Sequence, residues 1–281
     1  AVRSLMKYKV QTTASIVGLA LGFVCFALSA VWVRYEQTFD SFHRGADRMY
    51  LLGSNSWRDT GLSHRFLLAE ELKETFPEVE DAAAYWYLEI PVMLSEDATE
   101  EVNLGCIRTD SLFVHMFDVR LMRGSWSFLN VPEEVALTEE GALRLFGTTD
   151  VLGCTVYCQN KTYRISAVLT GWGQHTNFPF SIMLGMDQDE KNNTSYCDYY
   201  ISLRLRAGVD TVALVTQMNN SSLKYKVSQR WDGKKCVLSL EPLTHCRYTV
   251  FQDKLSVSIF YIRLFSALGL LLIVLALVNF F

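Results

Sequence analysis

The hydrophobic positions of this chain are concentrated at its two ends. Residues 13–33 form a run of 21 residues without a charged side chain, and residues 264–281 form a second run of 18. In a helix, roughly 20 apolar residues are long enough to cross the ~30 Å hydrocarbon core of a bilayer. We therefore predict transmembrane helices at 13–33 and 264–281. We expect the second to be truncated, so that the chain is the N-terminal portion of a longer polypeptide.

The charged positions lie mainly between the two runs. All 30 acidic residues fall there, with 23 basic residues, which gives a net charge of −7. Arg3, Lys7 and Lys9 precede the first run with no acidic residue among them. The positive-inside rule then places the N-terminus in the cytoplasm and residues 34–262 outside it. This charge distribution argues against nucleic acid as a partner, because phosphate binding needs a concentrated basic face.

A cleaved signal peptide is the alternative interpretation of the first run. Ala27 and Ser29 are small residues two positions apart, as a cleavage site requires. The apolar run, however, continues through Trp32 and Val33 and is longer than the usual signal core. Trp32 and Tyr35 also form the aromatic edge that is typical of a retained helix. We favour a retained helix.

Two weaker patterns concern the membrane. Residues 1–12 carry apolar side chains at near-helical spacing between basic ones, which predicts a cytoplasmic interfacial segment or, equally, a frayed basic flank. Gly18 and Gly22 form a G-x-x-x-G pair, which would allow a second helix to approach closely.

Helical and strand-like periods alternate between the two runs, and this predicts an α+β domain. Residues 62–76 place apolar side chains on one side and end before Pro77, which predicts a helix. A second helix is predicted over residues 209–219. Strands are predicted within or at residues 79–94, 101–107, 199–205 and 237–243. The stretch 248–262 is ambiguous, and we favour a helix from about residue 257.

A second unit occupies roughly residues 108–186. Thr138 is the expected N-cap of a helix that ends at Gly147, with acidic residues in its first turn. Strands at 155–159 and 161–169 follow, joined by a tight turn at Asn160. Because strands on both sides of this unit complete one core, we interpret it as an insertion packed on the first part.

Six cysteines lie in the middle domain: Cys106, Cys154, Cys158, Cys197, Cys236 and Cys246. In an oxidising compartment they permit up to three disulfides, and the sequence does not select a pairing. Cys154 and Cys158 resemble half of a zinc site, but no second ligand pair has suitable spacing. We therefore predict no metal site.

Several segments, in order, resemble one family. They are FDSFHRGADRMY (39–50), FPEVEDAA (76–83), DSLFVHMFDVRLMRG (110–124), VALTEEGALRLFG (135–147), DVLG (150–153) and YRISAVL (163–169). Together they resemble the first half of MacB-like, FtsX-like ABC transporter permeases, especially those of the Bacteroidetes type. The closing ALVNFF resembles the start of that family's second span. Val151 stands where the family usually has Pro, and Cys154 where it usually has Lys.

The resemblance implies an architecture and a set of partners. Such permeases have four spans and work as dimers, homomeric or heteromeric, with a separate or fused ATP-binding subunit in the bacterial inner membrane, and some use a periplasmic adaptor protein. The periplasmic core domain would comprise a porter-like α+β part, residues 47–105 and 199–243, and a smaller inserted α+β part, residues 106–186. The lipid bilayer would hold the two flanking helices, which transmit motion driven by ATP.

The sequence contains no set of residues that points to catalysis on this chain. The P-loop pattern, H-E-x-x-H and G-x-S-x-G are all absent, and the five histidines are scattered. We predict a non-catalytic subunit that carries no cofactor, with the ATPase on another chain or domain. Solvated or packing roles are the expected ones for the histidines.

Two clusters are the candidate contact sites. The motif Phe39, Asp40, Phe42 and His43 follows the first span, where its expected role is to fix the helix exit against the domain. The aromatic group Tyr85, Trp86 and Tyr87 is interpreted first as core and second as a docking surface for cargo or a partner. The competing hypothesis for the whole chain is the extracytoplasmic sensor domain of a chemoreceptor or histidine kinase, which also lies between two spans.

Overall fold

The computed structural model describes residues 9–56, 59–61, 63–193, 198–223, 237–249 and 259–280. It divides into two compact units. One consists of Ala1–Phe39 with Arg247–Phe281, and the other of Asp40–Cys246.

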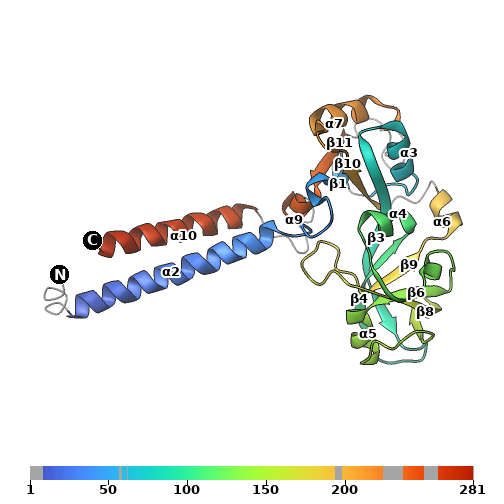
Figure 1. Ribbon diagram of the computed structural model, residues 1–281, viewed down its shortest axis with the longest axis horizontal. Coiled ribbons are helices and arrows are strands. Elements are labelled where there is room, and N and C mark those ends of the chain that lie inside the picture. The colour runs from blue at the N-terminus through green and yellow to red at the C-terminus, as the bar shows by residue number, and fades with distance from the viewer. Residues whose placement is uncertain are drawn as a thin grey trace. The chain divides into compact units, whose positions relative to one another are not determined.

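The first unit is a pair of helices that lie side by side (Figure 1), α2 over Lys9–Gln37 and α10 over Ile259–Phe280. The rings of Trp32 and Phe265 meet edge to face with centroids 5.4 Å apart. Among the described residues, one stretch, Ile16–Gln37, is long and apolar enough to cross a membrane. The predicted run 13–33 lies within α2. That α10 also crosses the membrane stays a prediction, and residues 1–8 lie outside the described part.

The second unit contains all of the described strands and nearly all of the short helices. Its strands are β1 Met49–Ser56, β2 Asp59–Gly61, β3 Val79–Met93, β4 Val102–Thr109, β5 Leu121–Gly124, β6 Glu134–Thr138, β7 Thr155–Cys158, β8 Lys161–Leu169, β9 Ile182–Gly185, β10 Tyr200–Leu205 and β11 Val237–Pro242. The short helices are η1 Ala46–Arg48, α3 Leu68–Thr75, α4 Ser111–Met116, η2 Trp126–Leu129, α5 Glu139–Phe146, α6 Gln188–Asn192, α7 Thr211–Asn220, η3 Leu243–His245 and α9 Cys246–Thr249.

These strands form one mixed sheet in the described part of the chain. Its order is β11-β1-β10-β3-β4-β9-β6-β8-β5, with β2 beside β1 and β7 beside β3 and β8. The β4–β9 and β6–β8 pairs are parallel, whereas β3 pairs antiparallel with both of its neighbours, β10 and β4. The predicted α+β class is confirmed.

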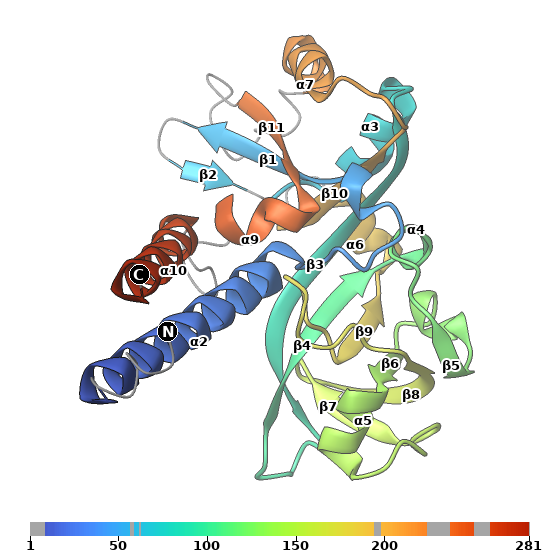
Figure 2. The same cartoon turned by 60° about the vertical axis from the view of Figure 1, so that its left-hand side comes forward.

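Strand β3 is shared by two hydrophobic cores. Its first half sends Val79, Ala82 and Ala84 into a core with α3, α7, β10 and β11, and its second half sends Ile90 and Val92 into a core with β6, β8 and β9. Figure 2 shows β3 as one long curved ribbon that passes from the first group of strands to the second. Trp86, near the middle of the strand, packs against both cores. The predicted division of the domain at residue 105 stays a prediction.

Local signals in the sequence are realised where they concern neighbouring residues. The Thr138 hydroxyl accepts a hydrogen bond from the Gly141 amide at 3.1 Å and caps α5, which ends at Gly147 with φ +70°. Gln159 and Asn160 take φ values of +51° and +61° between β7 and β8. This is the backbone of a type I′ hairpin turn, which favours Asn. The predicted capped helix and tight turn are confirmed.

The helix predicted over residues 62–76 is wrong at its start. Helix α3 begins only at Leu68, because His64 pairs with Tyr199 in an isolated antiparallel bridge. The His64 amide donates to the Tyr199 carbonyl at 2.8 Å, and the Tyr199 amide donates back at 3.1 Å. A backbone engaged in this long-range bridge cannot also form the first turn of a helix. The predicted helix over 209–219 is found as α7, which begins two residues later and ends one residue later than predicted.

The cysteines described by the structure carry free thiols. Cys106, Cys158 and Cys246 are buried, while Cys25 and Cys154 are exposed. Cys197 and Cys236 lie outside the described residues. Burial raises the pKa of the Cys158 thiol to about 11, so this side chain behaves as a core residue and stays protonated at neutral pH.

His64 makes the stability of the fold depend on pH. Its ring is fully buried, with Nε2 3.0 Å from the Leu52 carbonyl oxygen, and burial lowers its pKa from 6.5 to about 4 despite that hydrogen bond. Below pH 6.5 the unfolded chain binds a proton at this site that the folded chain binds only near pH 4. The folded state therefore loses stability as the pH falls through this window.

We predict that His64→Gln removes this dependence. Between pH 6.5 and 4, the wild-type free energy of unfolding should fall by about 3 kcal/mol more than that of the variant. The measurement is urea denaturation of both proteins in detergent micelles at half-unit pH steps. Carboxylates titrate equally in the two proteins, so parallel stability curves would show that His64 is not the responsible group.

Candidate functional site

The site begins at Asp40, the first residue of the second unit. Its carboxylate is fully buried and binds two consecutive residues of the loop that follows β8. Oδ1 accepts from the Thr176 hydroxyl. Oδ2 accepts from the Asn177 amide at 3.1 Å and from its side-chain Nδ2 at 2.5 Å. The Asp40 amide donates to the His175 carbonyl at 3.3 Å. Asp40 thus fixes the segment after α2 to the loop at residues 170–181.

The backbone at Asp40 explains why an acidic residue can stand there. Its φ is +55°, in the left-handed region, which Asn and Asp tolerate better than other residues with a side chain. The turn that results allows the His43 amide to donate to the Asp40 carbonyl at 3.4 Å. It also brings His43 Nε2 to 3.7 Å from Asp40 Oδ1.

His43 in turn enters a large group of stacked rings. Its imidazole meets Trp172 edge to face at 4.7 Å between centroids and Phe117 at 5.1 Å. Further ring pairs extend this group through Phe113 and Tyr85 to Phe178. We call the following residues the aromatic cluster: His43, Tyr85, Phe113, Phe117, Trp172, Phe178, Phe180 and Tyr200.

Within the cluster Tyr85 is completely buried. Its hydroxyl lies 3.1 Å from Ser202 Oγ, and burial raises the pKa of Tyr85 well above its usual value. A phenol in this state remains neutral and has its hydrogen-bonding capacity met inside the protein. Tyr85 therefore belongs to the packed interior, and a docking role for the group Tyr85, Trp86 and Tyr87 stays a prediction.

The predicted group of three aromatic residues divides between two faces of β3. Side chains alternate along a strand, so Tyr85 and Tyr87 share one face and Trp86 occupies the other. The Tyr87 hydroxyl donates to the Pro179 carbonyl at 3.2 Å, and its ring lies 5.5 Å from Phe178. The structure thus unites Tyr85 and Tyr87 with Asp40 and His43 around the loop at residues 170–181, and it places Trp86 elsewhere.

Phe42 and Phe39 have different surroundings. Phe42 is half exposed, with its ring 4.2 Å from that of His43. Phe39 belongs to the helical unit, where the Arg247 guanidinium lies 3.8 Å above its ring centroid. The Arg247 Nε also donates to Glu36 Oε2 at 2.6 Å, and the Glu36 side chain is nearly buried. This ion pair joins the end of α2 to the segment before α10.

The structure does not test the predicted helix contact at Gly18 and Gly22. A Cβ added at Gly18 would meet nothing within 4 Å, whereas Gly22 is buried. The close helix approach that is described lies at Gly269, where an added Cβ would come within 3.4 Å of the Phe26 ring. Contact through the G-x-x-x-G pair stays a prediction.

Sequence reasoning missed the loop that Asp40 binds. Thr176 and Asn177, with Trp172 and Phe178, belong to the stretch GWGQHTNFPF, in which aromatic residues alternate with turn formers. That combination is itself a signal, because exposed turns seldom carry several large rings. The loop is also pinned at Gly105, whose carbonyl accepts from the Ser181 amide at 2.8 Å. A Cβ on Gly105 would lie 2.0 Å from the Pro179 oxygen, so only glycine fits.

Comparison with known proteins gives the family. The family model described as the MacB-like periplasmic core domain matches residues 12–221. The chain belongs to this family. The first segment of a MacB-like, FtsX-like permease that the sequence motifs implied is thereby confirmed, with one apolar helix that precedes the MacB-like domain. No curated protein matches the chain.

Three solved structures share the fold of the MacB-like domain. A domain of a protein described as a permease from Porphyromonas gingivalis is 18% identical, with a TM-score of 0.59 over 80% of this chain and 99% of that one. The extracellular domain of the ABC-type transporter YknZ from Gram-positive bacteria is 15% identical, with a TM-score of 0.50 over 68% and 98%. The periplasmic region of MacB from Actinobacillus actinomycetemcomitans is 10% identical, with a TM-score of 0.51 over 75% and 96%.

The Asp40 contacts lead to a stability prediction with an internal control. Asp40→Ala leaves three donors on Thr176 and Asn177 without an acceptor, so we expect a loss of about 3 kcal/mol or more in the free energy of unfolding. Asp118→Ala is the matched control, since Asp118 has φ +53° but an exposed side chain. It should cost only the backbone term, about 1–2 kcal/mol. Equal losses in urea denaturation would show that the Asp40 carboxylate contributes nothing.

Proposed function

We propose that this chain is part of the permease subunit of a mechanotransmitting ABC transporter. In this role it couples ATP hydrolysis by a partner ATPase in the cytoplasm to export or extraction of a substrate in the periplasm. The observation that carries the proposal is the family match over residues 12–221, in a chain whose candidate membrane helix begins just inside that range. The domain itself is non-catalytic in this proposal and needs no cofactor.

The charge distribution supports a specific topology. Arg3, Lys7 and Lys9 favour a cytoplasmic N-terminus, and the acidic middle suits a domain on the far side of the bacterial inner membrane. In this arrangement α2 and α10 are both spans, and further spans follow. A second permease copy completes the dimer, the ATPase binds from the cytoplasm, and an adaptor protein is a further candidate partner.

Contacts on each side of the junction between Phe39 and Asp40 support mechanical coupling of the helices to the domain. The Arg247–Glu36 ion pair and the contact of Arg247 with the Phe39 ring hold the ends of α2 and of the segment before α10 together. Asp40, the next residue after Phe39, is bound to Thr176 and Asn177 within the folded domain. In this proposal a movement of α2 reaches the domain through the chain connection at Phe39–Asp40.

Topology is the first test of this function. Lys7→Cys and Glu100→Cys are introduced separately into a chain in which Cys154, Cys197 and Cys236 are replaced by serine. In intact spheroplasts, a membrane-impermeant maleimide should label the cysteine at residue 100 and not the one at residue 7. Labelling of both from the outside would contradict the proposed orientation.

Coupling to an ATPase separates the transporter from the sensor. The full-length protein, coexpressed with an ABC ATPase from the same genome, should copurify with that ATPase. In nanodiscs it should change the rate of ATP hydrolysis severalfold relative to the ATPase alone. A reading frame that continues into a heptad-rich signalling helix or a kinase, with no further spans, would contradict the transporter and support the sensor.

A further inference from the structure

A pocket lies on the face of β3 that Trp86 occupies. Its volume is about 460 Å³, and it is open where the two hydrophobic cores meet. The lining residues are Trp86, Arg108, Gln159, Met186, Glu190, Asn193 and Tyr199. The volume lies within the range of small-molecule sites, which often form where two structural parts join.

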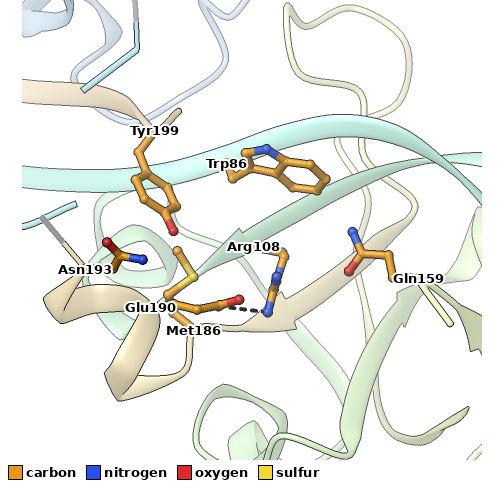
Figure 3. Close-up of a pocket in the computed structure, with 7 residues that line it drawn as sticks. All are labelled: Trp86, Arg108, Gln159, Met186, Glu190, Asn193 and Tyr199. Atoms are coloured by element: carbon orange, nitrogen blue, oxygen red, sulfur yellow. Dashed lines mark ion pairs between the residues drawn. The ribbon is translucent and has the colours of Figure 1, made fainter. Parts of the chain in front are cut away.

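The lining combines apolar walls with one pair of opposite charges. Arg108 Nη2 lies 2.9 Å from Glu190 Oε2, and the two side chains are 24% and 38% exposed. Figure 3 shows this pair beneath the Trp86 ring, with Tyr199 and Met186 to one side and Gln159 to the other. Indole, phenol and thioether groups offer apolar contact, while the Gln159 side chain adds an uncharged donor and acceptor.

The charge balance of this lining selects the ligand. A cation or an anion that enters is attracted by one member of the ion pair and repelled by the other, so little net attraction offsets the hydration that it gives up. A neutral amide has no net charge to be repelled or to lose its hydration. Its carbonyl can accept from a guanidinium and its N–H can donate to a carboxylate.

The ion pair retains capacity for such a ligand. A guanidinium has five N–H donors, and the described contact to Glu190 uses a single nitrogen. The ε N–H of Arg108 is buried and has no acceptor among the described residues. A buried donor without a partner is unfavourable, so an arriving carbonyl oxygen that reorients the guanidinium gains a bond that is absent in the empty pocket.

We propose that this pocket binds a small, electrically neutral amide that carries one apolar group. The apolar group packs against Trp86, Tyr199 and Met186, and the amide pairs with Arg108 and Glu190. The site is separate from the Asp40 contacts and the aromatic cluster, which occupy the opposite face of β3. The proposal goes beyond the transporter function and does not depend on it.

The test uses three probes with the same leucine side chain and different charge. They are N-acetyl-leucine amide, which is neutral, N-acetyl-leucine, which is an anion, and leucine amide, which is a cation at pH 6.5. The full chain in detergent micelles is labelled with 5-fluorotryptophan, and its ¹⁹F spectrum is recorded during each titration. The sequence has six tryptophans, so Trp86→Phe and Trp126→Phe identify the two resonances that are needed.

The expected result is saturable movement of the Trp86 resonance, with Trp126 unchanged. The neutral probe should bind at least tenfold more tightly than either charged probe. Glu190→Gln should shift this preference toward the anion and Arg108→Gln toward the cation, each by about tenfold. The unchanged Trp126 resonance reports that both variants are folded.

Two outcomes would overturn the proposal. One is that no probe shifts the Trp86 resonance more than the Trp126 resonance. An equal shift of both resonances would indicate only that the probe partitions into the micelle. The other is that all three probes bind with equal affinity in the wild type and in both variants, since the ion pair would then play no part. Neither result bears on copurification with an ATPase, so the proposed transporter function is judged separately.

Discussion

The buried carboxylate of Asp40 is the interaction on which the rest of the site depends. An ionised group removed from water costs several kcal/mol unless donors replace its hydration. Here three donors come from two consecutive residues, Thr176 and Asn177, so the charge is compensated in only one conformation of that loop. Once those residues are fixed, Trp172 and Phe178 on either side of them reach His43, Phe117 and Tyr85. The aromatic cluster is thus a consequence of one satisfied charge together with the burial of the rings around it.

Strand β3 imposes the second constraint. Because one 15-residue strand contributes to both hydrophobic cores, the two parts of the domain share a continuous backbone ladder as well as a chain connection. Side-chain alternation then gives the strand two different faces at its midpoint. Tyr85 and Tyr87 close one face with rings and internal hydrogen bonds, and Trp86 leaves the other face with a pocket. Because β3 is continuous, a displacement of one core relative to the other would bend the strand near Trp86. The bend would affect the contacts of Tyr85 and Tyr87 on one face and the pocket on the other.

The sequence predicted what neighbouring residues determine. The cap of α5 at Thr138, its end at Gly147 and the hairpin at Asn160 follow from contacts within a few positions, and all three are found. The start of α3 was missed because His64 pairs with Tyr199, far along the chain. The loop bound by Asp40 was missed for the same reason, since Thr176 lies 136 positions away. Hydrophobic periodicity does not indicate such a pairing, because it reflects only the spacing of apolar residues. The contact at Asp40 joins polar groups that meet only when the chain has folded. The contact role predicted for the motif at residues 39–43 stays a prediction, and the sequence did not indicate Thr176 and Asn177 as the partners of Asp40.

The residues at the two junctions between the helical unit and the domain are each engaged within their own unit. The chain passes between the two units twice, at Phe39–Asp40 and at Cys246–Arg247. At the first crossing Phe39 lies under the Arg247 guanidinium and Asp40 is hydrogen bonded within the domain. At the second, Arg247 is paired with Glu36, and the buried Cys246 thiol donates to the Pro242 carbonyl at 3.3 Å. The side chains that flank each crossing are thus held by contacts within their own unit, in the helical unit for Arg247 and in the domain for Asp40 and Cys246.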